Sequence, residues 1–325
     1  MKILAVTHQL DFSGAPIALM ECLINLQLLG NEINVVSIKE DEGLGSILTE
    51  NKIKIISGNV NLDQYDLIIF NTLLSVKFIP KHKLKKTKII AWIHEGPYLA
   101  GLAWSYETEI ENLKWVDAII VPSHESKKEW ENFINVDKIF CIYSPISIPK
   151  EIINLTAVSS GPKKICIVDP RESYRGIERI EKFLINCDDD VEAYFVGAEK
   201  SIDNVKYHRK NNYYIGRTTR LNTLQVIAAC DIYLSATCMA TQNRGLCEAI
   251  LLNKEIYLSS IGVHREIGNL VGINESHYFK PLIDIELNLN EKSNSNSYKN
   301  LVEFSSDNFN NKFSSVLDYL FKDKL

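Results

Sequence analysis

Short apolar runs alternate with helical segments along most of the 325-residue chain. Continuous apolar runs between helices indicate strands of a parallel sheet that is covered on both faces. The first half is expected to hold strands at residues 2–7, 33–38, 53–56, 66–70, 88–93, 117–121 and 138–142, with helices at 15–29, 43–51, 103–114 and 123–134. The pattern therefore predicts an α/β fold with a doubly wound parallel sheet.

The alternation breaks near residues 144–162 and then restarts. Ser144–Pro149 and Ala157–Pro162 are rich in Pro, Ser and Gly, which is typical of a linker between domains. The second half is expected to hold strands at residues 164–168, 192–196, 213–215, 231–234 and 255–259, with helices at 176–186, 220–229 and 246–253.

A chain of this length suits two domains of about 150 residues each. We expect one Rossmann-like domain at residues 1–150 and another at 151–300. Residues 301–325 are expected to form a helix with an apolar face made by Phe309, Phe313, Val316, Leu317 and Leu320. Open parallel sheets bind ligands at the carboxyl ends of their strands, so the two domains are expected to face each other across a cleft.

Composition excludes several classes of protein. A net charge of −5 gives no global reason to expect nucleic acid as a partner. The seven cysteines lack a C-x-x-C pair and are scattered in apolar surroundings, which favours buried free thiols over disulfides or a zinc site. Neither a signal peptide nor an apolar run of about 18 residues is visible. We therefore expect a cytoplasmic protein.

Two residues of the first half follow predicted strands. Gly14 lies in the loop after the first strand, where the absence of a Cβ would let a diphosphate approach the backbone. His94 follows the apolar run at 88–93 and could hydrogen-bond a sugar hydroxyl or a leaving phosphate. The alternatives are an ordinary turn glycine and a structural histidine held by backbone groups.

In the second half, two arginines and one glutamate lie in segments that follow predicted strands. Arg171 and Arg175 lie at a strand–loop–helix junction and could grip a phosphate. Glu248 is expected in the first turn of a helix that begins near Gly245, where it could accept hydrogen bonds from ribose hydroxyls. The alternatives are surface ion pairs for the arginines and a simple helix-dipole preference for the glutamate.

A basic run precedes the strand at 88–93. Lys77, Lys81, His82, Lys83, Lys85, Lys86 and Lys88 are interleaved with Phe78, Ile79 and Leu84. Such a run could contact anionic lipid headgroups, because each lysine near an anionic surface adds about 1 kcal/mol. The alternative is a solvated connection between two strands.

The order of several motifs resembles the retaining glycosyltransferases of the GT-B fold, family four. Ser13–Leu19 resembles the family's glycine-rich first loop, Trp92–Glu95 the strand end with its active-site histidine, and Arg171–Gly176 its phosphate-gripping segment. Phe195–Gly197 and Tyr214–Gly216 resemble strand–glycine turns, and Gly245–Ala249 with Ile261–Ile267 resembles the donor site. The family's first donor-site glutamate is replaced by Ala240, eight positions before Glu248.

The resemblance implies a function and roles for residues. It implies transfer of a sugar, of the hexosyl type, from a nucleotide diphosphate donor to a saccharide or lipid-linked acceptor. It implies retention of configuration, no metal and no cofactor. Donor-binding residues would be Gly14, Arg171, Arg175, Gly216, Gly245, Leu246 and Glu248, with His94, Arg171 and Arg175 acting in catalysis and Glu248 on the ribose.

The missing glutamate leaves the donor sugar without its expected contact. Gln242, Asn243 or a backbone N–H is expected to take its place. Abundant Asn, Ile and Lys fit an AT-rich microbial genome and favour surface polysaccharide assembly. The first domain would serve the acceptor, the second the donor, and Lys77–Lys88 would hold the protein at the inner face of a membrane. Two alternatives stay open: a non-catalytic subunit that binds a nucleotide or a partner enzyme, and a sugar-nucleotide epimerase of the same fold.

Overall fold

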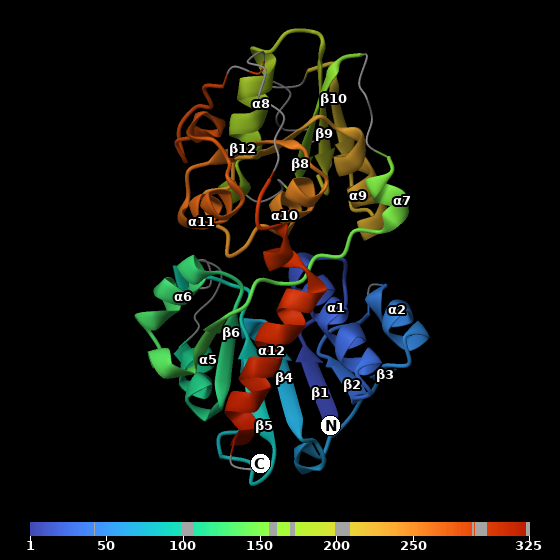
Figure 1. Ribbon diagram of the computed structural model, residues 1–325, viewed down its shortest axis with the longest axis vertical. Helices are drawn as coiled ribbons and strands as arrows, with labels where there is room; N and C mark the ends of the chain where they lie inside the picture. The colour runs from blue at the N-terminus through green and yellow to red at the C-terminus, as the bar shows by residue number, and fades with distance from the viewer. Residues whose placement is uncertain are drawn as a thin grey trace. The chain divides into compact units, whose positions relative to one another are not determined.

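The computed structural model describes residues 1–41, 43–98, 107–155, 161–169, 173–198, 209–287, 289 and 298–322 (Figure 1). The chain divides into two compact units. Unit 1 comprises Met1–Ser147 and Val302–Leu325, and unit 2 comprises Ile148–Leu301.

Unit 1 contains a seven-stranded parallel sheet in the order β3-β2-β1-β4-β5-β6-β7. Its central strands are buried on both faces, which explains why they are continuous apolar runs. The strands are β1 (Lys2–Thr7), β2 (Glu32–Ser37), β3 (Lys54–Ile55), β4 (Leu67–Asn71), β5 (Lys88–Trp92), β6 (Ala118–Val121) and β7 (Ile139–Cys141).

The helices of unit 1 connect these strands. They are α1 (Gly14–Leu28), α2 (Leu44–Glu50), α3 (Leu73–Val76), α5 (Glu107–Asn112) and α6 (His124–Glu131), with short 3-10 turns η2 (Leu113–Trp115) and η3 (Val136–Lys138). The last helix of the chain, α12 (Ser306–Phe321), also packs in this unit.

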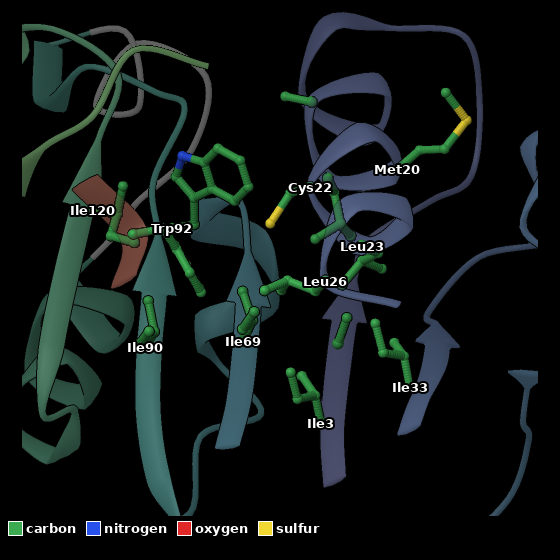
Figure 2. Close-up of a cluster of buried hydrophobic side chains, with 14 of the residues drawn as sticks. Ile3, Met20, Cys22, Leu23, Leu26, Ile33, Ile69, Ile90, Trp92 and Ile120 are labelled. Atoms are coloured by element: carbon green, nitrogen blue, oxygen red, sulfur yellow. The ribbon is translucent and has the colours of Figure 1, made fainter. Parts of the chain in front are cut away.

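One core of unit 1 lies where α1 and α12 pack on the sheet. Figure 2 shows Cys22, Leu23 and Leu26 of α1 beside side chains of four strands: Ile3, Ile33, Ile69 and Ile90. Phe309 of α12 stacks on Trp92 of β5, with ring centroids 5.4 Å apart. The terminal helix therefore belongs to the core of the first unit.

Unit 2 contains a six-stranded parallel sheet in the order β10-β9-β8-β11-β12-β13. The strands are β8 (Lys163–Val168), β9 (Val191–Val196), β10 (Asn212–Ile215), β11 (Ile232–Ser235), β12 (Glu255–Ser259) and β13 (Tyr278–Phe279). The helices are α7 (Lys150–Ile153), α8 (Ile177–Ile185), α9 (Arg220–Ala229), α10 (Arg244–Leu251) and α11 (Gly262–Val271), and the turn η4 (Ser173–Arg175) precedes α8.

The predicted fold class is confirmed, with differences at short elements. The sequence does not predict α3, α7 or β13, because elements of two to four residues carry no periodic pattern. The ten-residue helix α11 is also absent from the prediction, which gives Ile261–Ile267 only as a segment that resembles the donor site. Helix α7 falls inside the segment expected to be a linker. Of the helix expected at 103–114, residues 107–112 are helical and 103–106 lie outside the described residues. Across the described ranges, none of the helices combines the length and apolar character needed to cross a bilayer.

Candidate functional site

The carboxyl edge of the unit 1 sheet carries a set of polar side chains. Three pairs of residues lie at or just after the carboxyl ends of the neighbouring strands β1, β4 and β5. They are Thr7 and His8 at β1, Asn71 and Thr72 at β4, and His94 and Glu95 after β5. Parallel strands bring their carboxyl ends to one edge, so these side chains meet although they are far apart in the sequence.

His94 is held by Asn71, which is fully buried. The Nε2 atom of His94 lies 2.9 Å from Asn71 Oδ1. An amide oxygen only accepts hydrogen bonds, so this pairing assigns a proton to Nε2. The Asn71 amide nitrogen in turn lies 3.4 Å from both Thr7 Oγ1 and the Ala15 carbonyl oxygen, which fixes the orientation of the amide.

A second histidine, His8, lies at the same edge. Its Nδ1 atom is 3.0 Å from Thr72 Oγ1. Burial lowers the pKa of His8, although Asp11 acts in the opposite direction. Thr72 has a φ of 78°, a conformation that costs a threonine of order 1–3 kcal/mol and is concentrated at functional sites. The strained backbone places the Thr72 hydroxyl beside His8.

The Glu95 side chain binds backbone groups at this edge. Its Oε2 atom accepts the backbone N–H groups of Leu73, at 2.9 Å, and of His94, at 3.1 Å. Burial raises the pKa of this carboxyl, and the backbone hydrogen bonds act against the rise. Glu95 therefore joins the start of α3 to the loop that carries His94.

Gly14 is the first residue of α1 and is exposed. A Cβ added at this position would meet no atom within 4 Å. The fold therefore does not require glycine here, and the space beside the start of α1 is open.

Unit 2 presents charged groups at the equivalent edge. Arg175 lies after β8, with its Nη2 atom 3.5 Å from Asp169 Oδ2. Burial alone would lower the pKa of Arg175, but Asp169 and neighbouring groups outweigh it and raise the pKa, so the guanidinium stays charged. Its Nε atom is buried and has no hydrogen-bond partner among the described residues. A buried donor of this kind is costly unless water or a ligand satisfies it.

The loop before Arg175 is tied to the loop after β11. The Tyr174 carbonyl oxygen accepts the backbone N–H of Cys238 at 2.8 Å. Gly176 adopts a φ of 78°, and a Cβ there would approach the Ala236 carbonyl oxygen to 2.7 Å. Only glycine allows these two loops to lie so close, which fixes Arg175 at the carboxyl edge.

Glu248 lies in a buried cluster with two arginines. Its Oε1 atom is 3.1 Å from Arg244 Nε and 3.4 Å from Arg220 Nη2. Arg220 begins α9 and Arg244 begins α10, so the cluster joins the starts of both helices. Two guanidiniums thus share one carboxylate oxygen.

The place of Glu248 in α10 differs from the prediction. The helix begins at Arg244, near Gly245 as predicted, but Glu248 lies beyond its first turn and not within it. The cause is Asn243, which caps the helix. Its backbone is left-handed, with a φ of 58°, and its Oδ1 atom accepts the Leu246 N–H at 3.3 Å. A helix-dipole preference therefore does not explain Glu248.

Asn243 is the centre of a polar network within unit 2. Its Oδ1 atom also accepts the Tyr233 hydroxyl at 3.1 Å, and its amide nitrogen donates to Ser235 Oγ at 3.1 Å and His264 Nε2 at 2.9 Å. His264 Nδ1 donates to the Ser259 carbonyl oxygen at 2.8 Å. Burial lowers the pKa of His264 to about 4, so the imidazole is neutral at physiological pH.

Most of the other residues predicted for the donor site are packed inside unit 2. Gln242 is buried with its amide beside Cys247 Sγ, and Leu246 is fully buried. A Cβ at Gly245 would approach the Tyr233 hydroxyl to 2.9 Å, so close packing explains this glycine. Gly216 directly follows β10 and Ala240 lies half-buried in the loop before α10. Arg171 lies outside the described residues.

Several residues at these edges are absent from the sequence-based prediction. They are His8, Asn71, Thr72, Glu95, Arg220, Arg244 and His264. The signal for Asn71 and His8 was present, because a polar residue follows each apolar run. For Arg220 and Arg244 only the three-dimensional packing of two helix starts reveals the cluster. Within the described residues, no three His, Cys, Asp or Glu side chains gather into a metal site.

Comparisons with known proteins agree with this architecture. Residues 1–155 match the family model described as glycosyl-transferase family 4. Anabaena HepE in complex with UDP-glucose has 16% sequence identity and a TM-score of 0.69, covering 98% of this chain and 91% of its own. The chain has the GT-B glycosyltransferase fold.

Other GT-B structures show the same likeness at low identity. The lipopolysaccharide outer core galactosyltransferase WaaB has 15% identity and a TM-score of 0.62, with 86% of each chain covered. Sucrose-phosphate synthase of Thermosynechococcus elongatus has 13% identity and a TM-score of 0.62, with 87% of each chain covered. No curated protein matches the sequence. The predicted resemblance to GT-B glycosyltransferases of family four is confirmed in fold, and in family model over residues 1–155.

Proposed function

We propose that the protein is a glycosyltransferase that uses a nucleotide diphosphate sugar as donor. The observation that carries the proposal is the cationic carboxyl edge of unit 2, where Arg175 presents a buried donor without a partner among the described residues. HepE, which shares the fold, was solved with UDP-glucose. Surface polysaccharide or glycoconjugate synthesis, retention of configuration and independence of metal remain parts of the proposal.

Arg175 is assigned to the diphosphate. A guanidinium stays charged throughout the reaction and stabilises the negative charge that develops on the departing diphosphate, usually the largest catalytic contribution. Its partner Asp169 holds it in place across 3.5 Å. Arg171 and the Gly14 backbone are assigned to the same group, from the sequence resemblance and, for Gly14, from the open space at the start of α1.

Glu248 is assigned to the ribose through one oxygen. The two arginine contacts engage Oε1, and we assign Oε2 to the ribose hydroxyls. An ionised carboxylate accepts hydrogen bonds from hydroxyl groups more strongly than a neutral group does.

The sugar and acceptor contacts are assigned to unit 1. His94 and His8 hydrogen-bond to uncharged side chains, Asn71 and Thr72, and such groups suit sugar hydroxyls. In unit 2, the Gln242 and Asn243 amides are engaged within the protein. Backbone N–H groups of this loop are therefore the better substitutes for the glutamate replaced by Ala240.

The proposal is tested with purified protein, a panel of nucleotide sugars and a mixed acceptor extract. We expect release of nucleoside diphosphate that depends on acceptor, together with a new glycosidic bond detected by mass spectrometry. The Arg175→Met variant serves as the inactive control. A free epimeric sugar as the only product would instead identify an epimerase.

A non-catalytic subunit is the second candidate, and Ala240 favours it. This candidate predicts that nucleotides bind and stabilise the protein, while no donor is turned over under any acceptor condition. Donor turnover by wild type that Arg175→Met abolishes would exclude it.

A further inference from the structure

The amino edge of the unit 1 sheet, opposite His94, combines lysines with exposed apolar side chains. Three segments meet there: Lys77–Lys86 before β5, Lys114–Trp115 before β6, and Phe133–Lys138 before β7. We call these three segments the basic edge. Strands β5, β6 and β7 are parallel neighbours, so the segments that precede them lie side by side (Figure 1).

Contacts between strand starts confirm this arrangement. Lys138 Nζ donates to the Val116 carbonyl oxygen at 3.1 Å, joining the segments before β7 and β6. Asp117 Oδ2 accepts the Ile89 N–H at 2.9 Å, and Asp117 Oδ1 lies 3.9 Å from Lys88 Nζ. These bonds join the starts of β6 and β5.

The basic edge carries an excess of positive charge. Its exposed lysines are Lys77, Lys81, Lys83, Lys85, Lys86 and Lys114. The three segments contain seven lysines and one acid, Asp137. Glu111, Asp117 and Glu131 lie beside them in the chain, Asp63 and Asp66 precede the neighbouring strand β4, and Asp117 is engaged with Lys88. No acid interrupts residues 77–94. The local charge therefore opposes the net charge of −5 of the whole chain.

Large apolar side chains project among these lysines. Phe78 is 48% exposed, Trp115 36%, Phe133 40% and Val136 47%. Lys77 Nζ lies 5.1 Å from the centre of the Phe78 ring. Scattered apolar residues on a surface need no explanation. Aromatic rings together with lysines, however, are typical of the boundary between lipid and water.

We propose that the basic edge docks on an anionic lipid bilayer. The lysines would contact lipid phosphates, and Phe78, Trp115 and Phe133 would enter the headgroup region. The carboxyl edge with His94 would then lie away from the lipid by at least the length of β5, about 16 Å at 3.3 Å per residue. This docking is independent of the donor chemistry, so its failure would leave the proposed transferase activity untouched.

The test is flotation of the full chain with vesicles of phosphatidylcholine alone or with 30% phosphatidylglycerol. We expect binding to the anionic vesicles only, and its loss in 0.5 M salt. Because each lysine contributes roughly fivefold at an anionic surface, Lys83→Gln/Lys85→Gln/Lys86→Gln should lower the partition coefficient about a hundredfold. The matched control is Lys210→Gln/Lys280→Gln, two exposed lysines of unit 2, which should bind as the wild type does.

A second measurement reports insertion directly. Trp115 fluorescence, taken as the difference between wild type and Trp115→Phe, should be quenched by brominated lipid in anionic vesicles. Equal binding to neutral and anionic vesicles, or an unchanged partition coefficient for the triple variant, would overturn the proposal. Binding of single-stranded nucleic acid, or a dimer that the triple variant dissociates, with no vesicle binding, would also overturn it.

Discussion

The two sheets have the same parallel architecture, yet their carboxyl edges differ in chemistry. In unit 1 the two histidines of this edge hydrogen-bond to uncharged side chains, Asn71 on His94 and Thr72 on His8. In unit 2 it is built from ions, with Asp169 on Arg175 and Glu248 between two arginines. Neutral groups suit sugar hydroxyls, whereas a cationic edge suits a diphosphate. One fold thus carries two kinds of chemistry on the residues that follow its strands.

The largest expected effect concerns the ionic edge. Glu248→Gln removes the charge shared by Arg220 and Arg244 and should lower the free energy of unfolding by about 3 kcal/mol, as for a broken buried ion pair. The control is Glu275→Gln, which breaks the exposed pair with Arg265 and should cost less than about 1 kcal/mol. Urea denaturation measures both. If Glu248→Gln and Glu275→Gln lower the free energy of unfolding by equal, small amounts, the Glu248 cluster does not hold the two helix starts together.

Arg175→Met should weaken nucleoside diphosphate binding about thirtyfold, because one charge-assisted hydrogen bond is worth about 2 kcal/mol. The matched control is Arg209→Met, a change of the same type just before β10 at the opposite edge of the same sheet. Isothermal titration calorimetry measures both affinities. If Arg175→Met binds as tightly as the control, the diphosphate is not held by Arg175.

Acid should destabilise unit 2 through His264. Its pKa is about 4 in the folded protein and about 6.5 in the unfolded chain. The unfolded state therefore binds more protons between these values, and the stability present above pH 6.5 is lost as the pH falls. The loss at pH 5 should be about 2 kcal/mol.

His264→Gln removes the titrating group and is the control for this effect. Urea denaturation at pH 7.5 and pH 5 should show a smaller difference for the variant than for wild type. The same pH difference in both proteins would assign the acid sensitivity to other groups.

The smallest expected effect is at Gly14 in unit 1. Gly14→Ala should leave the melting temperature unchanged, since its Cβ meets nothing within 4 Å. It should weaken diphosphate binding about tenfold, because the added Cβ would hold the phosphate away from this backbone N–H, and a hydrogen bond to a charged group is worth about 1.5 kcal/mol. Gly161→Ala, also in open space, is the control. Equal affinities for the two variants would make Gly14 an ordinary turn residue.

The sequence predicts the strands well, because strands buried on both faces are continuous apolar runs. It also predicts which residues follow them, including His94, Gly14 and Arg175. It cannot predict that Glu248 pairs with Arg220, since the two lie on different helices and meet only through packing. The prediction also places Glu248 in the first turn of α10, because it did not recognise Asn243 as a cap in the left-handed conformation.

The most direct test of a diphosphate site in unit 2 is a titration with matched nucleotides. Wild-type protein is titrated with uridine, guanosine and adenosine di- and monophosphates in a calorimeter, without added metal. We predict that at least one diphosphate binds more than tenfold more tightly than its monophosphate, and that Arg175→Met removes this difference. Equal affinities for each di- and monophosphate pair, or no binding of any nucleotide, would contradict the proposed site.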